Sequence, residues 1–495
     1  MIPAPLTQAC PAVRPATEAD DVGGVRPQFV AEPASTEEAG ALLRAAAQLG
    51  LSVVPRGGGT RLDWGVPPRQ CDLVVDTGRL DQVLEHAAGD LVARVQAGVR
   101  LDRLREVLRT ANQRLAVDPP TAVRPGSGDS TARPGDSSGD GPVRPGSSPG
   151  ASPPADSPAA RPPADSADSP GPADPGTVGG LIATGVAGPL RLRYGSPRDL
   201  LIGVTLVRAD GIVARAGGKV VKNVAGYDIG KLLAGSYGTL GLITEATFRL
   251  HPQPKAAAYV SLASPPGSAG DAAAALLAAA ASPLAPVAAE LDWPRQDAPV
   301  SIAVALEGDA ESVAERAALM HDLLRDQPAG DTTAPEIGDQ PPAWWGRGPA
   351  AATAGTVLRI AFWAGQLSTV LAAIRATAGS TGLDPAVGGS AAAGVLHAAL
   401  PATAPAEAVR RFVDGLRGAL APSRPGPAAV TPAGSAPGSA GPPSRASVVV
   451  LTAPPELRGK LDMWGPVPAA GLMRAVKDQF DPEHRMSPGR FAGGI

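Results

Sequence analysis

The sequence predicts an α+β protein with two folded parts and a short carboxy-terminal segment. Between Pro175 and Pro254, glycine turns separate apolar runs with the length of β-strands. From residue 255 onwards, strand-like runs alternate with long alanine-rich helical stretches, an order typical of helices on one face of an antiparallel sheet. Two stretches rich in Pro, Gly, Ser and Ala, about 121–174 and 421–445, interrupt these parts.

Composition limits the possible functions. A length of 495 residues with 44% hydrophobic content can supply cores for two or three domains. A formal net charge of −3 and an aromatic content of 3% argue against a nucleic-acid partner. The two cysteines, Cys10 and Cys71, form no CxxC pair, which excludes a cysteine-ligated iron–sulfur cluster within this chain and fits a reducing compartment.

Membrane and export signals are not visible in the sequence. No apolar run approaches the ~18 residues that span a bilayer. The amino terminus has no basic region followed by an apolar one, as a secretory signal would. We therefore expect a cytoplasmic protein without a transmembrane segment, peripheral at the inner face of the membrane only through partners.

The first part of the chain begins with an expected disordered lead, residues 1–24, followed by a domain over residues 25–254. Ser35 followed by Glu38 is a capping-box pattern and predicts a helix from Thr36 to about Gly50. A short buried strand, 51–55, then leads into a glycine-rich loop. By itself this loop reads as a plain turn or as a phosphate site, and it matches neither GxGxxG nor GxxxxGK[ST]. The loop comprises Arg56, Gly57, Gly58, Gly59 and Thr60.

Further elements of this domain follow from hydrophobic patterns. Residues 71–77 and 90–98 read as strands, and 99–113 as an amphipathic helix. Residues 121–174 hold almost no large apolar side chain, so we expect a disordered insertion whose two ends remain neighbours. Directly after it, Gly179 and Gly180 allow close approach of a ligand, and phosphate is the candidate because clustered N–H groups bind anions.

The domain ends with a hairpin and one more strand. Asp210-Gly211 predicts a turn between two strands, and residues 237–252 give a further strand. Between them, residues 218–228 are rich in Lys, Asn and Tyr. This segment reads either as a solvated loop or as one that faces a ligand or partner, and the sequence leaves the roles of Lys219, Lys222 and Asn223 open.

The second part, residues 255–459, is expected to form the helix-covered antiparallel sheet. Its predicted strands are 257–264, 286–293, 300–308, 356–365 and 446–454, and its predicted helices are 271–281, 310–324, 367–378 and 405–420. The last segment, 460–495, reads as a helix that Asp481-Pro482 ends, followed by a turn that contains Arg490.

Five ordered motifs carry a resemblance to a known family. They are VVPRGGGTRL, LAVDPP, GTVGGLIATG with the following RLRYG, VVKNVAGYDIGKLLAGSYGTLGLITEATFRL, and FDPEHRMSPGRF. Together they resemble the FAD-linked oxidases of the vanillyl-alcohol-oxidase type, and most of all the E-type subunits of bacterial glycolate oxidases. The resemblance covers about Pro33 to Pro254 and the last thirty or so residues. It implies a PCMH-type FAD-binding domain of two subdomains, an α+β cap domain and a carboxy-terminal segment that returns to the FAD domain.

The resemblance also assigns residues to the cofactor. It implies that Arg56 to Thr60 form the pyrophosphate loop, with the N–H groups of the three glycines facing the phosphates. A second wall would consist of Thr177, Val178, Gly179 and Gly180. Gly185 and the backbone of Gly241 to Ile243 would lie along the cofactor, with the latter near adenine. Tyr194-Gly195 matches a supporting pair, and Arg490 lies in SPGRF, where Ser487 replaces the commoner Asn of the family.

Departures from the family pattern bear on mechanism. Relatives that attach FAD covalently use a His or Cys near the glycine loop, and this loop has neither, so we expect non-covalent FAD. The five histidines lie in separate segments without metal-ligand spacing, so no metal site is expected. No catalytic residue is identified, although Arg191 and Arg193 are candidates for contact with a carboxylate.

The resemblance implies an FAD-binding subunit of a glycolate oxidase, or 2-hydroxy-acid dehydrogenase, complex. That subunit takes part in the oxidation of glycolate to glyoxylate, beside a D-type FAD subunit, and passes electrons to an iron–sulfur F-type subunit. Two alternatives stay open. The chain is a non-catalytic FAD-binding subunit that relays electrons, or a stand-alone FAD-dependent oxidase of another hydroxy acid.

Overall fold

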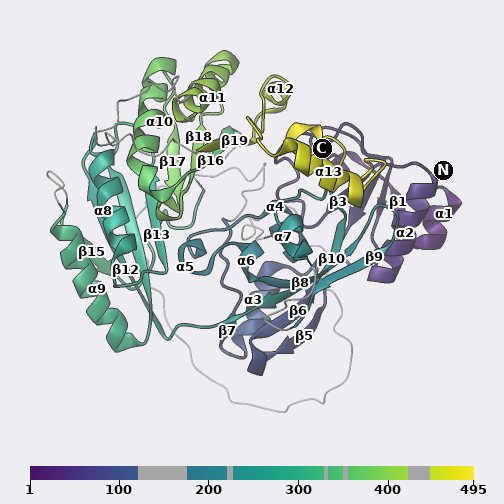
Figure 1. Cartoon of the computed structure of the whole chain (residues 1–495), viewed down its shortest axis with the longest axis horizontal. Coiled ribbons are helices and arrows are strands. Elements are labelled where there is room, and N and C mark those ends of the chain that lie inside the picture. The colour runs from purple at the N-terminus through teal and green to yellow at the C-terminus, as the bar shows by residue number, and fades with distance from the viewer. Residues whose placement is uncertain (121–175, 220–226, 328–332, 349–354, 422–445) are drawn as a thin grey trace, which may run out of the picture.

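The computed structural model describes residues 1–120, 176–219, 227–327, 333–348, 355–421 and 446–495. They form two lobes (Figure 1). One lobe contains a four-stranded and a five-stranded sheet together with the carboxy-terminal segment, and the other contains a single eight-stranded sheet. The expected insertion at 121–174 and nearly all of the low-complexity stretch at 421–445 lie outside the described residues, as do Lys222 and Asn223.

The four-stranded sheet has the order β1-β2-β4-β3, with β2, β4 and β3 parallel. Helix α2 connects β2 to β3 and begins as the capping pattern predicts, because Ser35 Oγ accepts from the Glu38 N–H. The carboxylate of Glu38 reaches one residue further back and accepts from the Ala34 N–H at 3.1 Å. The elements are β1 (Val13–Pro15), β2 (Phe29–Ala31), α2 (Thr36–Gln48), β3 (Val53–Arg56) and β4 (Leu73–Asp76).

The prediction of a disordered lead at residues 1–24 was wrong. Helix α1 (Ala4–Ala9) packs on α2, and β1 pairs with β2. Leu6 and Cys10 are both fully buried among the side chains of α2. Each piece is too short to give a hydrophobic period, so only contacts with distant residues order this segment.

The five-stranded sheet has the order β5-β6-β10-β8-β9 and is antiparallel throughout. The predicted hairpin around Asp210-Gly211 is confirmed: Gly211 has φ +80°, and the Ile212 N–H donates to Asp210 Oδ1 at 3.0 Å. Helices α3 and α4 cover the sheet. Its elements are β5 (Val83–Ala87), β6 (Val92–Gln96), α3 (Leu101–Arg109), α4 (Val178–Thr184), β8 (Leu201–Val207), β9 (Val213–Gly217) and β10 (Leu242–Arg249).

Short elements join this lobe to the next. Strands β7 and β11 form a two-stranded ribbon, and α5 packs against the eight-stranded sheet. The elements at this junction are β7 (Gln113–Arg114), α5 (Arg191–Tyr194) and β11 (His251–Pro252). The other short elements belong to the first lobe: η1 (Glu18–Asp20), η2 (Ala88–Asp90), α6 (Pro197–Leu200) and α7 (Ile229–Leu233).

The eight-stranded sheet is the expected helix-covered antiparallel sheet, in the order β15-β12-β14-β13-β17-β18-β16-β19. Helices α8 to α11 cover its outer face (Figure 1). Strands β17 and β18 escaped the sequence patterns because Gly and Ala fill them. The elements are β12 (Ala256–Ser264), α8 (Ala269–Ala281), β13 (Ala288–Trp293), β14 (Val300–Gly308), α9 (Ala310–Arg325), β15 (Glu336–Gly338), β16 (Thr356–Ala361), η4 (Ala364–Gln366), α10 (Leu367–Thr381), β17 (Ala386–Gly389), η5 (Ala391–Ala393), β18 (Val395–Leu400), α11 (Ala406–Leu420) and β19 (Ser447–Thr452).

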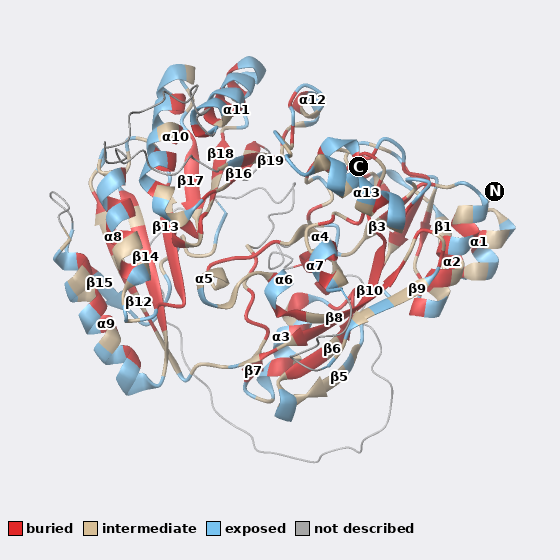
Figure 2. Ribbon diagram, in the orientation of Figure 1, coloured by how far each residue is buried: buried red, intermediate tan, exposed pale blue. Residues whose placement is uncertain are grey.

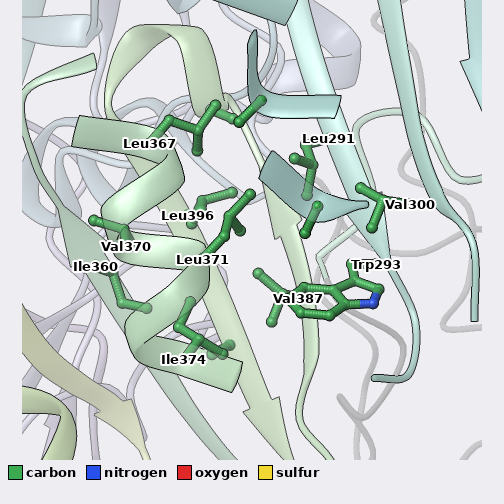
Figure 3. Packing of buried hydrophobic residues seen from close by; sticks show 14 of the residues in the cluster. Leu291, Trp293, Val300, Ile360, Leu367, Val370, Leu371, Ile374, Val387 and Leu396 are labelled. Carbon is green, nitrogen blue, oxygen red and sulfur yellow. The ribbon is translucent and has the colours of Figure 1, made fainter. Parts of the chain in front are cut away.

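The core of this lobe lies between the sheet and its helices. Figure 3 shows Ile360 and Leu396 from the strands against Val370 and Leu371 of α10. Burial follows the same division, with buried strands behind helices whose outer faces are exposed (Figure 2). Because side chains alternate along a strand, the neighbours of Ile360 and Leu396 point to the opposite, inner face.

The carboxy-terminal segment returns to the first lobe. Residues 485–487 run beside β3, with the Val53 N–H donating to the Arg485 carbonyl and the Ser487 N–H donating to the Val53 carbonyl, both at 2.8 Å. Lys477 is fully buried and donates to Asp481, the Thr239 carbonyl and the Met486 carbonyl at 2.6, 2.7 and 2.8 Å. The helices here are α12 (Pro455–Arg458), α13 (Ala470–Phe480) and η6 (Ala492–Gly494).

Candidate functional site

A pocket opens where the two sheets of the first lobe meet α4 and the carboxy-terminal segment. It holds about 740 Å³ of empty space, part of it open to solvent. Ten of the twelve residues that the sequence assigned to a cofactor line it: Arg56, Gly57, Gly58, Gly59, Thr60, Thr177, Gly179, Gly180, Gly241 and Ile243.

The first wall is the loop that follows β3. A Cβ on Gly57 would lie 2.2 Å from Thr177 Oγ1, so glycine is required for this loop to approach α4. Gly59 has φ +74° and open space around its Cα. The N–H groups of Gly57, Gly58 and Gly59 make no hydrogen bond within the described part of the chain. Three unpaired amides beside a pocket suit an anion.

The second wall is the first turn of α4. Thr177 is its N-cap, and Thr177 Oγ1 accepts from the Gly180 N–H at 3.3 Å. The N–H groups of Val178 and Gly179 donate to the carbonyls of Val99 and Ala97 at 2.9 and 2.7 Å. The anion-binding nest expected at Gly179 and Gly180 is therefore not formed, because these amides already have acceptors. What the glycines provide is close packing, since a Cβ on Gly179 would lie 3.0 Å from Ala97 Cβ.

Two predicted residues lie outside the pocket lining. Val178 is fully buried in the core beneath α4. Gly185 ends that helix with φ +63°. Both therefore contribute to the position of the second wall and not to its surface.

The third wall was largely missed by sequence reasoning. Tyr237 has φ +56° and lines the pocket together with Gly238, whose φ is +73°. Arg490 is 3% exposed and donates to the carbonyls of Leu62 and Trp64 at 2.8 and 3.0 Å. A repeated Tyr-Gly pair at 237–238 was the available signal. The other lining residues that the assignment omitted are Pro55, Arg61, Leu62, Thr77, Ala183 and Thr184, and Leu242 lines the pocket between the assigned Gly241 and Ile243.

Arg56 is held by two carboxylates. It donates to Asp76 at 2.7 Å and to Asp20 at 2.9 Å, and Asp20 also accepts two hydrogen bonds from Arg14 at 2.8 Å. The bonds from Arg14 keep the pKa of Asp20 far below its usual range. The amino-terminal residues thus brace the start of the glycine loop.

A second polar group occupies the inner face of the eight-stranded sheet. Arg359 of β16 lies directly opposite His397 of β18, and His397 lies opposite Gly388 of β17. Glu290 of β13 is 4% exposed on the same face, where α5 with Arg191 packs against β13. Arg359 Nε is buried without an acceptor, and neither arginine side chain has a hydrogen bond or ion pair with another described residue.

Electrostatics of this inner-face group follow from burial. Burial, with Arg359 and Arg191 nearby, lowers the pKa of His397 to about 4, so the imidazole is neutral. Burial raises the pKa of Glu290 to about 8. The pKa of Arg191 is lowered, first by burial and then by the charge of Arg359. Two like charges therefore lie close together, and neither has a bonded counter-ion among the described residues.

Other singled-out residues lie elsewhere. Tyr194 bridges the two lobes through hydrogen bonds to Arg114 at 3.0 Å and Glu307 at 3.3 Å. Arg193 is exposed on α5. Lys219 is half-exposed and pairs with Glu85.

The pocket residues fit an FAD molecule by chemistry. The unpaired amides of the glycine loop suit a pyrophosphate, and Gly241, Leu242 and Ile243 line the pocket with backbone and apolar side chains. The pocket lining contains neither His nor Cys. Within the described residues, no helix has the length and apolar character to cross a bilayer, and no three His, Cys, Asp or Glu side chains are grouped as metal ligands.

Known proteins share both sequence and fold with this chain. A profile described as an FAD binding domain matches residues 27–127 and 166–217. The glycolate oxidase subunit GlcD of Bacillus subtilis is 31% identical over 46% of this chain and 38% of its own length. The D-lactate dehydrogenase of Archaeoglobus fulgidus is 32% identical over 45% and 39%. The chain thus covers about two fifths of the length of these relatives.

Two further matches extend this picture. The glycolate oxidase subunit GlcE of Escherichia coli is 48% identical over 80 residues, which are 16% of this chain and 23% of that protein. An alkyldihydroxyacetonephosphate synthase structure superposes with a TM-score of 0.59 at 16% identity, over 94% of this chain and 76% of its own, which shows the fold. The chain is thus similar in sequence to FAD-linked oxidoreductases, and the profile match places an FAD binding domain in its amino-terminal lobe.

Proposed function

We propose that this chain is the FAD-binding subunit of a 2-hydroxy-acid dehydrogenase of the glycolate oxidase kind. It binds one FAD non-covalently and takes part in the oxidation of glycolate, or another small 2-hydroxy acid, to the 2-oxo acid. The observation that carries the proposal is the three-walled pocket, with unpaired amides at Gly57, Gly58 and Gly59 facing glycine-containing walls from α4 and the 237–243 segment. The cofactor, when bound, supplies a two-electron acceptor.

The chain's own residues have binding and positioning roles in this proposal. The amides of the glycine loop hold the pyrophosphate, and the Asp20–Arg56–Asp76 ion pairs fix the loop that carries them. The carboxy-terminal segment closes the pocket with Arg490, which Leu62 and Trp64 hold in place. The inner face of the eight-stranded sheet covers the substrate side.

The proposed partners are a D-type FAD subunit and an iron–sulfur F-type subunit, to which electrons pass. Similarity to a GlcE and a GlcD glycolate oxidase subunit supports this assembly. The second candidate function is an FAD-binding relay subunit without its own hydroxy-acid oxidation. Its support is the scatter of the five histidines over separate segments of the sequence.

Two measurements test the proposal. Acid precipitation of the purified chain should release FAD into the supernatant, and flavin retained in the pellet would contradict non-covalent binding. Anaerobic mixing with glycolate or D-lactate should bleach the flavin of the chain, either alone or in the co-purified complex. Bleaching only when the D-type subunit is present and holds its own flavin would select the relay function.

A further inference from the structure

We propose that Arg191 and Arg359 form the subsite that binds the carboxylate of the substrate, with the His397 imidazole beside it as hydrogen-bond partner of the substrate hydroxyl. This inference rests on the proposed function and assigns its substrate-binding residues. The ligand proposed for the inner face of the eight-stranded sheet is a small monocarboxylate.

The first argument is the cross-strand row Arg359, His397, Gly388. Directly opposed residues on one face of an antiparallel pair have Cβ atoms about 5 Å apart. The side chains of Arg359 and His397 therefore lie side by side on the inner face. The next residue of the row, Gly388, has no side chain. The row continues to Asp292 of β13, which lies opposite Gly388, and a Cβ on this glycine would lie 3.2 Å from the Leu291 carbonyl oxygen and 3.6 Å from Asp292 Oδ1.

The second argument is the position of this row relative to the pocket. Strand β19 pairs with β16 and also contacts the residues that follow the glycine loop. The Gly65 N–H donates a hydrogen bond to the Leu451 carbonyl of β19 at 2.7 Å. Thr452 Oγ1 also donates to Asp63 at 3.2 Å. The charge of Arg359 reaches the pocket residue Tyr237, because it lowers the pKa of that phenol against the larger raising effect of burial. Arg359 is thus one strand away from β19, which contacts residues 63–65, directly after the lining residues Arg61 and Leu62.

The third argument is the missing counter-charge. Arg191 and Arg359 influence each other electrostatically, and neither donates a hydrogen bond to any described residue. Arginine side chains in such partly buried positions normally have an anionic partner. Three carboxyl groups influence Arg191, namely Glu290, Asp199 and Asp118. Burial raises the pKa of Glu290 to about 8 and that of Asp118 to about 7, and Asp199 accepts from the N–H and hydroxyl of Ser196, so none of the three forms an ion pair with the arginine.

The chemistry selects the ligand class. Two guanidinium groups offer planar forks for one carboxylate, and a neutral imidazole accepts from a hydroxyl on the adjacent carbon. A 2-hydroxy acid presents these two groups next to each other. Around the row, Gly388 and Gly389 of β17 and Ala399 of β18 are small, which suits a small side group, whereas Val395 is the larger neighbour of His397 on this face.

The test uses oxalate, a carboxylate without a C–H bond that flavin could oxidise. The full-length FAD-loaded chain is titrated by calorimetry and by the flavin absorbance spectrum. Arg359→Met and Arg191→Met should each weaken oxalate binding about 10- to 100-fold. Arg359→Lys, which keeps the charge but not the fork, should weaken it less. FAD content should equal that of the wild type in every variant.

The matched control is Arg193→Met, because Arg193 lies on the same short helix as Arg191 but is exposed. It should leave oxalate affinity unchanged. The inference is overturned if the wild-type chain does not bind oxalate, if both Met variants bind it as tightly as the wild type, or if Arg193→Met has the same effect. Arginine-dependent oxalate binding without reduction by any 2-hydroxy acid would reject the proposed function and retain the subsite.

Discussion

The arginines that line the pocket and those on the inner face of the eight-stranded sheet differ in what holds them. Arg56 on the glycine-loop side donates to Asp20 and Asp76, and Arg490 donates to two backbone carbonyls. On the sheet side, Arg191 and Arg359 have no such acceptor among the described residues. An arginine side chain therefore indicates ligand binding only where the protein itself supplies no acceptor for its guanidinium group. On the glycine-loop side, the ligand-binding groups are backbone amides.

The largest effect is expected on FAD binding, from a substitution within the glycine loop that carries the unpaired amides. Gly57→Val should abolish FAD binding, because its Cβ would lie 2.2 Å from Thr177 Oγ1 and force the loop away from α4. The flavin-to-protein ratio of the purified variant measures this. Gly89→Ala is the control, since a Cβ there has nothing within 4 Å, and it should retain full flavin. Full flavin in Gly57→Val would mean that the loop does not hold the cofactor.

The second effect concerns a paired charge that holds the carboxy-terminal segment. Lys477→Met should lower the free energy of unfolding by about 3–5 kcal/mol, because it leaves Asp481 buried and without its cation. Chemical denaturation followed by tryptophan fluorescence measures the loss. Adding Asp481→Asn should recover part of it by removing the stranded charge. Equal stability of Lys477→Met and the wild type would show that the pair has no structural role.

The third effect tests the brace behind Arg56. Asp20→Ala leaves Arg14 and Arg56 without their shared carboxylate, and should cost about 2–3 kcal/mol of unfolding free energy and weaken FAD binding. The pKa of Asp20 is lowered in the folded state, so its contribution is present above about pH 4 and is lost as the pH falls below that value. Asp21→Ala is the control, because its pair with Arg26 is on the surface and should cost under about 1 kcal/mol. If Asp20→Ala binds flavin as tightly as the wild type does, the ion pairs of Asp20 stabilise the fold but do not contribute to FAD binding.

The two sides also differ in how far the sequence predicts them. The glycine loop, the α2 cap and the Asp210-Gly211 turn depend on neighbours in the chain, so their residue types identify them. The eight-stranded sheet and its helices follow from hydrophobic period. The order of residues 1–24 and the third pocket wall depend on contacts with residues distant in sequence. No local pattern reports such contacts.

The inner-face group of Arg359 and His397 also depends on contacts between residues distant in sequence, which no local pattern predicts. Arg359 and His397 are 38 residues apart in numbering and meet only because β16 pairs with β18 in one register. A shift of that register by one residue would turn one of the two side chains towards the hydrophobic core, so that they no longer share a face. The sequence therefore offers two polar residues within apolar strands, and only the pairing brings them together.

The smallest effect should appear in the pH dependence of stability. Burial raises the pKa of Glu290 to about 8 from an unfolded value near 4.5, and Ser390, Asp118 and Arg191 are the groups that influence it. Its contribution to stability is thus present below about pH 4.5 and is lost as the pH rises towards 8. Glu290→Gln cannot ionise and should avoid this loss. Its stability relative to the wild type should therefore increase between about pH 5 and pH 8.

Urea unfolding at several pH values measures this difference, with Glu336→Gln as a control on the exposed strand β15, where the wild-type pH profile should be retained. His397 titrates in the opposite sense: its lowered pKa of about 4 means that stability falls as the pH drops from about 6.5 to 4, in wild type and Glu290→Gln alike. The subtraction of the two curves therefore isolates Glu290. Parallel curves from pH 5 to pH 8 would mean that Glu290 is ionised in the folded protein. Arg191 would then have a counter-ion, and of the two sheet-side arginines only Arg359 would retain an unneutralised charge for a carboxylate.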